Sequence, residues 1–182
     1  MGLFWKAPNV VDELVEVVLN KHHSSRLQMA QIAIALDDSK SFVKNKFNWG
    51  SVNKFSSFNK LWQNQKFDFA IVLCSDSWNN ILNDSQKEAL IDLHLTRCNL
   101  EYVPETVMEG KKKKVVKDDW GRIKFTNEIK VDDEGNPKWY ISPLDIYVFV
   151  QNFERYGNWC SEFCQLNKFV SAEEQNEEQN EE

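Results

Sequence analysis

Residues 86–102, QKEALIDLHLTRCNLEY, contain the most chemically suggestive spacing in the chain. His94 and Cys98 are four residues apart, so one face of a helix could present both side chains to a metal ion. Cys160 and Cys164 have the same spacing, and the four side chains together would make a chemically suitable zinc site. Buried cysteines are also common as small apolar side chains with no metal. Both readings stay open on spacing alone.

Other catalytic motifs are missing from the sequence. It contains no Gly-x-Ser-x-Gly nucleophile turn and no glycine-rich phosphate loop, and its six glycines do not cluster. The pattern therefore favours neither acyl transfer nor nucleotide chemistry.

Composition predicts one folded domain with an acidic extension. Apolar residues make up 42% and aromatic residues 13% of the chain, enough to bury a core. The net charge is −6, and the last twelve residues carry six glutamates, so residues 1–170 sum to −6 + 6 = 0. We expect a single domain over 1–170 and a disordered acidic tail over 171–182.

The compartment is predicted from what the sequence lacks. It has no apolar run of membrane-spanning length, no signal peptide and no Cys-x-x-Cys pair. These features favour reduced thiols, a cytoplasmic setting and no membrane association.

The first half of the chain alternates between a helix and strands. A helix follows Pro8 over residues 9–23, and the stripe predicted to face the core comprises Val10, Leu14, Val17 and Val18. Strands are expected over 27–36, 41–50, with a turn at Gly50, and 66–74. His22 and His23 are expected as surface groups near the negative end of the helix.

The second half contains two further helices around a β-rich insertion. Ser85 and Glu88 have capping-box spacing, which predicts a helix from about 85 to 100. Residues 102–141 are interpreted as β-hairpin material, with turns at KDDWGR and DDEGNP.

The last helix has its own start and stop signals. Ser142, Pro143 and Asp145 are typical of a helix start, and Gly157 of a helix end. This order predicts an α+β fold, with a small mixed sheet packed on about three helices.

Several segments, in order, resemble the phage metallopeptidase family, small zincin-like proteins similar in style to SprT-like peptidases. FDFAIVLCSDSWNNILNDSQKEALIDLHL resembles the family's strand, acidic-Trp segment and zinc helix. WGSVNKFSSFNKLW and VDDEGNPKWYISPLDIYVFVQNFERYGNW resemble the segments before and after it. The resemblance covers about residues 8–160 and implies a zincin-like minimal domain. The alternative is an unrelated α+β domain with a coincidentally similar helix.

The resemblance implies a zinc site whose residues have changed here. The family's His-Glu-x-x-His motif supplies two ligands and a base from one helix. Leu93 and Arg97 stand at its ligand positions and His94 at the base position, and Leu144 stands at a further ligand position. Leucine cannot coordinate a metal, and arginine stays cationic. We therefore expect no cofactor, no catalysis, and Leu93 and Leu144 filling the former metal pocket.

A pseudoenzyme of this kind retains its surface, which predicts a binding function. The expected partner is a host or phage protein inside the host cell, and antagonism of a host defence system is one concrete version. The first alternative is a metal-binding protein or peptidase using the displaced His94/Cys98 site.

A nucleic-acid-associated factor is the second alternative. Lys111, Lys112, Lys113 and Lys114 lie close to Trp120, and on one hairpin they would form a basic ribbon with an aromatic tip. Lysines on an edge strand also occur simply to prevent aggregation.

Overall fold

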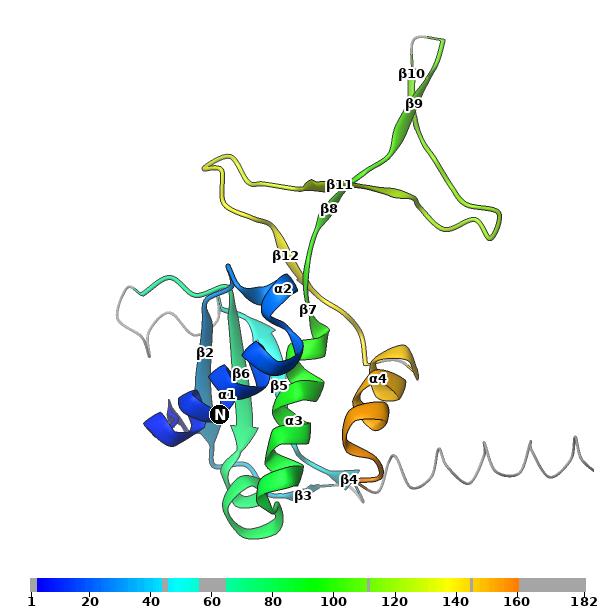
Figure 1. The fold of residues 1–182 in the computed structure, drawn as a ribbon. Helices are drawn as coiled ribbons and strands as arrows, with labels where there is room; N and C mark the ends of the chain where they lie inside the picture. Colours follow the sequence, from blue (N-terminus) through cyan, green and yellow to red (C-terminus); the bar gives the residue numbers. More distant parts are fainter. Residues whose placement is uncertain (1–2, 44–45, 56–64, 111, 145, 161–182) are drawn as a thin grey trace, which may run out of the picture.

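Strand β6 lies inside a four-stranded sheet of order β1-β2-β6-β5 (Figure 1). The strands are β1 (Phe4–Lys6), β2 (Ile32–Asp37), β5 (Gly50–Lys54) and β6 (Phe69–Cys74). β2 pairs with β6 in parallel, whereas β1 and β5 are antiparallel edge strands. All six residues of β6 are buried, as expected for a strand covered on both faces. The computed structural model describes residues 3–43, 46–55, 65–110, 112–144 and 146–160.

Helices cover one face of this sheet. The described helices are α1 (Asn9–His22), the short α2 (Ser24–Leu27), α3 (Asp84–Arg97) and α4 (Ile146–Tyr156), with a π-helical turn η2 (Ser77–Ile81) before α3. In Figure 1, α1 and α3 lie against the sheet and α4 packs on the outer side of α3. The α+β class predicted from the sequence is confirmed.

The buried stripe of α1 differs from the predicted one. Val10 and Val17 are 67% and 56% exposed, whereas Val11, Val15 and Val18 are buried in the main core. The predicted stripe was wrong in these two valines because the run VVDELVEVV offers two apolar stripes, and contact with the sheet selects one of them.

Gly50 begins β5 at a place where no other residue fits. Its φ is +117°, and a Cβ added there would lie 2.2 Å from the Val72 carbonyl oxygen of the paired strand. The predicted single strand over 41–50 is instead a short hairpin of β3 (Phe42–Val43) and β4 (Lys46–Phe47).

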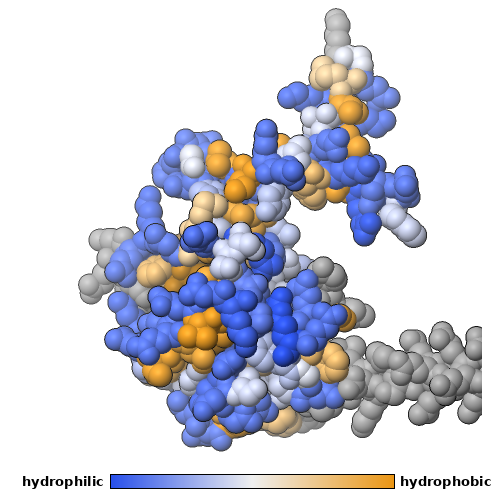
Figure 2. Space-filling model, in the orientation of Figure 1, coloured by the Kyte–Doolittle hydropathy of each residue, from blue (hydrophilic) through white to orange (hydrophobic). Residues whose placement is uncertain are grey.

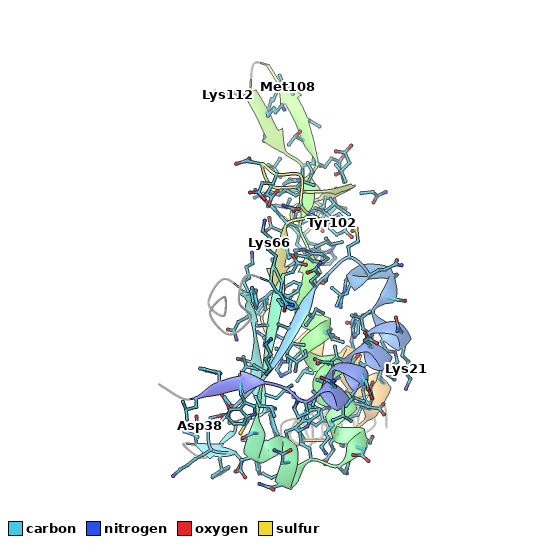
Figure 3. The ribbon with its side chains drawn as sticks, turned by 90° about the vertical axis from the view of Figure 1, so that its left-hand side faces the viewer. Lys21, Asp38, Lys66, Tyr102, Met108 and Lys112 are labelled. Carbon is cyan, nitrogen blue, oxygen red and sulfur yellow. The ribbon has the colours of Figure 1, made fainter. Side chains whose placement is uncertain are left out.

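A β-rich arm projects from the end of α3 that carries Arg97 (Figures 1 and 3). Its paired strands are β7 (Cys98–Leu100) with β12 (Trp139–Ile141), β8 (Tyr102–Pro104) with β11 (Phe125–Ile129), and β9 (Thr106–Glu109) with β10 (Lys112–Val115). Met108 and Lys112 mark its far end in Figure 3. The predicted β insertion is confirmed, and it begins at β7, directly after α3.

The first branch point of the arm is a ring of three backbone hydrogen bonds. The Glu101 amide donates to Lys138, Lys138 donates to Lys130, and Lys130 donates back to Glu101, each over 2.8 Å. Three ladders meet there: β7/β12, β8/β11, and the turn closed by the Val131–Pro137 bridge.

A second ring lies further out and has the same form. The Glu105 amide donates to Lys124, Lys124 to Val116 and Val116 to Glu105, over 2.9–3.0 Å. It joins β8/β11, the β9/β10 hairpin and the turn closed by the Lys117–Ile123 bridge. The two rings satisfy backbone groups that a branching ladder would otherwise leave unpaired.

None of the helices among the described residues is long and apolar enough to cross a membrane. The expected acidic tail, 171–182, lies outside the described residues.

Candidate functional site

Helix α3 begins at an N-cap that the sequence interpretation placed two residues too late. The Asn83 side chain accepts from the Gln86 amide over 2.9 Å, and the Gln86 side chain accepts from the Asn83 amide over 3.0 Å. This capping box replaces the predicted Ser85/Glu88 pair. The helix ends at Arg97, and residues 98–100 form β7 instead of a further turn.

Leu93, His94, Arg97 and Leu144, the four positions suggested by the family resemblance, line one cavity of about 220 Å³. Three of them come from α3 and Leu144 lies just before α4. The remaining wall consists of Leu90, the strand-edge residues Phe47, Asn48, Trp49 and Gly50, and Trp159 and Cys160.

The two leucines occupy different environments in this cavity. Leu93 is 6% exposed and belongs to the main core, whereas Leu144 is 48% exposed. The expectation that both would fill a former metal pocket is therefore not met, because Leu144 lies at the mouth and the cavity remains.

His94 is a buried side chain without a hydrogen-bonding partner. It is 3% exposed, and both ring nitrogens lack partners among the described residues. Burial, with a smaller contribution from the nearby Arg97 charge, lowers the pKa of His94 to about 3. The imidazole is therefore neutral at pH 7 and presents one N–H donor and one acceptor nitrogen.

Arg97 supplies a cation at the same cavity. Its Nε donates to the Ser142 carbonyl oxygen over 3.1 Å, and no carboxylate among the described residues pairs with it. Burial lowers the pKa of Arg97, yet a guanidinium remains charged at any physiological pH.

The cysteines of the displaced metal site are separated by the structure. Cys98 Sγ contacts the His94 carbonyl oxygen at 3.5 Å and does not line the cavity, and burial raises its thiol pKa to about 12. Cys160 lines the cavity, and Cys164 lies outside the described residues. Cys74 and Cys98 are free thiols.

Zinc needs at least three protein donors. Nowhere in the described ranges do three His, Cys, Asp or Glu side chains gather as a group able to hold a metal. At the cavity His94 and Cys160 are accompanied by a permanent cation and two leucines. The described residues therefore do not fit a zinc site.

Behind the cavity, Asp92 is the centre of a buried polar network that the sequence interpretation missed. Its side chain is fully buried and accepts from His23 Nε2 over 2.8 Å, Asn152 Nδ2 over 2.7 Å and Arg155 Nη1 over 2.6 Å. Burial alone would raise the pKa of Asp92, but hydrogen bonds from His23 and Asn152 and the Arg155 charge outweigh it and lower the pKa.

His23 is buried, so its predicted surface position was wrong. Arg26 Nη2 donates to His23 Nδ1 over 2.9 Å, which requires Nδ1 to be the acceptor and Nε2 to carry the hydrogen donated to Asp92. Burial lowers the pKa of His23, which is consistent with this neutral tautomer. His22 is half-buried, and its ring contacts Tyr156 at a centroid distance of 5.9 Å.

The network also fixes the wall of the cavity. Trp159 Nε1 donates to Asn152 Oδ1 over 2.7 Å, and Gln86 Nε2 donates to the Trp159 carbonyl oxygen over 2.8 Å. A sequence signal for this network existed: Asp92 interrupts the apolar run ALIDLHL, and a buried acid needs partners.

The lysine-rich stretch and Trp120 lie on different hairpins. Lys112, Lys113 and Lys114 are exposed on β10, whereas Trp120 occupies the turn after the second ring. Lys111 lies outside the described residues. The predicted ribbon with an aromatic at its own tip was therefore wrong, and Lys114 is paired with Glu109 over 3.0 Å.

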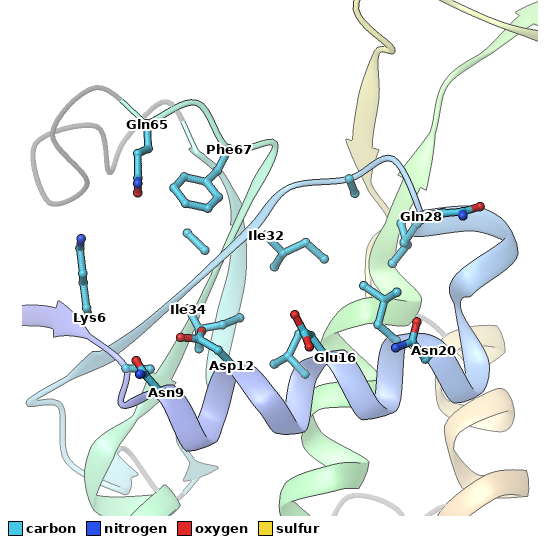
Figure 4. A pocket seen from close by; sticks show the side chains of 16 residues that line it. Lys6, Asn9, Asp12, Glu16, Asn20, Gln28, Ile32, Ile34, Gln65 and Phe67 are labelled. Atoms are coloured by element: carbon cyan, nitrogen blue, oxygen red, sulfur yellow. The ribbon is translucent and has the colours of Figure 1, made fainter.

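A larger cavity, of about 730 Å³, lies elsewhere, between α1 and β2. Figure 4 shows Asp12 and Glu16 of α1 beside Ile32 and Ile34 of β2. Burial and then the Glu16 charge raise the pKa of Asp12. None of the residues singled out from the sequence lines this groove.

Comparison with known proteins identifies one family. The profile of the family described as "Putative phage metallopeptidase" matches residues 3–173. No curated protein and no solved structure matches the chain. Because the match spans nearly the whole sequence, this chain belongs to the phage metallopeptidase family.

Proposed function

We propose that this protein is a catalytically silent member of its family that acts by binding a protein partner. Loss of catalysis is supported by the side chains at the cavity. Leu93 offers no lone pair to a metal, and Arg97 repels one electrostatically. A hydrolytic zinc centre of the family's kind would need the residues at positions 93 and 97 each to donate a lone pair to the metal.

The observation that carries the binding function is the exposed apolar surface of the arm. Trp120 is 83%, Met108 65% and Phe125 57% exposed, although each side chain is large enough to be a core residue. Figure 2 shows hydrophobic residues along the projecting arm beside hydrophilic ones. Exposed aromatic and methionine side chains are enriched in the centres of protein interfaces.

The proposed partner is a host or phage protein in the cytoplasm of an infected cell. Family membership points to a phage setting, which makes a component of a host defence system the first partner class to test.

The test is affinity capture from infected cells with a triple arm variant. Met108→Ser, Trp120→Ser and Phe125→Ser remove the apolar groups together, and we expect specific capture to be lost. Val10→Ser with Val17→Ser is the control, because these valines are also more than half exposed but lie on α1 of the body. Equal capture by the arm variant and the wild type would reject the arm as the binding surface.

The exposed lysines of β10 support a nucleic-acid-binding function as a second candidate. Binding through phosphates would weaken steeply with salt, and Lys112→Gln with Lys113→Gln would reduce that salt dependence. Salt-independent or undetectable binding to mixed single- and double-stranded DNA would remove this candidate.

A displaced metal site is the least favoured candidate, because the described residues bring only His94 and Cys160 to the cavity, beside the Arg97 cation. Metal analysis of the purified full chain tests it directly. Stoichiometric zinc that disappears in a His94→Gln variant would favour this site over the silent-enzyme proposal.

A further inference from the structure

The cavity beside α3 contains two polar groups that no described residue satisfies. Among the described residues, no carboxylate pairs with the two terminal amino groups of Arg97, whose side-chain hydrogen bond to the Ser142 carbonyl oxygen comes from Nε. Both ring nitrogens of His94 are buried, and no described residue hydrogen-bonds to them. A guanidinium without a counter-charge beside a cavity is suited to a ligand that brings a negative charge.

The remaining wall of the cavity is aromatic and apolar. Phe47 and Trp49 are stacked with ring centroids 4.8 Å apart, and Trp49 meets Trp159 edge-on at 6.0 Å. Leu93 adds an aliphatic surface deep in the cavity. These groups would surround a flat apolar body of about one ring, which a cavity of about 220 Å³ can accommodate.

We propose that this cavity binds a carboxylate attached to a small apolar or aromatic group. The guanidinium of Arg97 pairs with the carboxylate, the neutral imidazole of His94 adds no second charge, and the rings of Phe47, Trp49 and Trp159 enclose the apolar part. A guanidinium matches the two oxygens of a carboxylate in geometry and charge.

Other ligand classes fit less well. A divalent cation would be repelled by Arg97. A phosphate carries more charge and more acceptor oxygens than one guanidinium and one neutral imidazole can satisfy. The carboxylate could belong to a free acid or to the C-terminal residue of a peptide, and the partly exposed Leu144 at the mouth leaves room for either approach.

The first experiment compares an acid with its neutral isostere on the full chain. Titration with phenylacetate, followed by tryptophan fluorescence and calorimetry, should give saturable binding, whereas phenylacetamide should bind at least about tenfold more weakly. A second pair, N-acetylphenylalanine and N-acetylphenylalaninamide, distinguishes the two sources. If phenylacetate binds more tightly than N-acetylphenylalanine, the ligand is a free small acid. If N-acetylphenylalanine binds more tightly, the ligand is a peptide C-terminus.

The second experiment removes the proposed cation. Arg97→Gln should weaken phenylacetate binding at least about tenfold, and Arg97→Lys should weaken it less, because charge is kept while the bidentate geometry is lost. Arg122→Gln is the control, since Arg122 pairs with Asp118 on the arm. Circular dichroism confirms that each variant is folded.

Several results would overturn the proposal. They are absence of saturable acid binding to the wild type, equal affinity for acid and amide, or undiminished binding by folded Arg97→Gln. If Arg97→Gln does not fold, the binding of Arg97→Lys and the comparison of acid with amide still test the proposal. The triple arm variant should bind phenylacetate normally, so this inference and the proposed function can fail separately.

Discussion

The body and the arm of this protein are stabilised in opposite ways. In the body, side-chain hydrogen bonds connect segments that are distant in the sequence. The fully buried Asp92 accepts from His23, Asn152 and Arg155, which lie in two other segments. In the arm, two rings of backbone hydrogen bonds join the hairpins, and large apolar side chains remain exposed. Side-chain identity therefore constrains the body more strongly, whereas the arm surface is free to serve recognition.

The largest expected effect comes from breaking the buried network. Asp92→Ala would leave a buried histidine and Asn152 without their acceptor and Arg155 without its counter-charge, so we expect a loss of about 3–5 kcal/mol in the free energy of unfolding. Urea denaturation measures it. Asp132→Ala is the control in the arm, where the Asp132 carboxylate accepts from the exposed backbone amides of Glu134 and Asn136 and from the Asn136 side chain. A loss no greater than that of the control would contradict the importance of the network.

A second test uses the two leucines of the cavity. Leu93→Ala should destabilise the protein by about 2–5 kcal/mol because it enlarges a space inside the core. Leu144→Ala should change the free energy of unfolding by no more than about 0.5 kcal/mol, since its side chain is half exposed. Similar melting temperatures for the two variants would show that Leu93 is not packed as described.

Two tryptophans sharpen the comparison within the arm itself. Trp139, at the base, is 6% exposed and contacts Phe69 of the sheet at a centroid distance of 5.6 Å, so Trp139→Ala should cost about 3–5 kcal/mol. Trp120→Ala should change stability by no more than about 0.5 kcal/mol. Thermal unfolding distinguishes them, and a large loss for Trp120→Ala would mean that the arm has a core of its own.

Acid in the range where histidines titrate should weaken the body selectively, because all three histidines lie in α1, its C-terminal flank and α3. The pKa of each is lowered, so below about pH 6.5 the unfolded chain binds protons that the folded chain excludes, and stability falls as pH falls. The lowered pKa of Asp92 adds a further loss below its ordinary range near pH 4.

The histidine contribution is measured as the slope of stability against pH. Buried His94 should contribute up to about 1.4 kcal/mol per pH unit between pH 6 and 4, and His94→Gln should flatten the slope by that amount. An unchanged slope in the variant would mean that His94 does not titrate differently in the folded and unfolded chains.

The smallest expected effect concerns an ion pair at the first branch point. Lys130 Nζ lies 3.0 Å from Glu101 Oε2, and both side chains are partly exposed. Lys130→Met should alter stability by less than about 1 kcal/mol, because the backbone ring does not depend on the side chain. Denaturation in low and high salt measures it, and a larger loss would show that the pair, in addition to the ring, maintains the branch.

Local patterns in the sequence predicted the elements but not their partners. The alternation in FDFAIVLC was sufficient to predict the strand β6, and the turn residues of KDDWGR and DDEGNP were sufficient to predict two turns of the arm. These signals involve only neighbouring residues. The contact between His23 and Asp92 spans 69 residues and left no local mark beyond a lone acid in an apolar run. The backbone rings involve no particular side chains, so no residue pattern could have indicated them.

The candidate site was predicted only in part. The family resemblance singled out Leu93, His94, Arg97 and Leu144, and the structure places all four on one cavity. The opposite wall, from Phe47 to Gly50, could not be predicted, because its position depends on the pairing of β5 with β6.

The branched construction of the arm also has a consequence for protein engineering. Each of its three free ends is a turn containing a glycine with positive φ, at Gly110, Gly121 and Gly135, and nothing lies within 4 Å of where their side chains would be. The two hydrogen-bonded rings separate these three turns from one another. A foreign epitope or a fluorophore tag could therefore be inserted in any one turn without shifting the strand register at the other two.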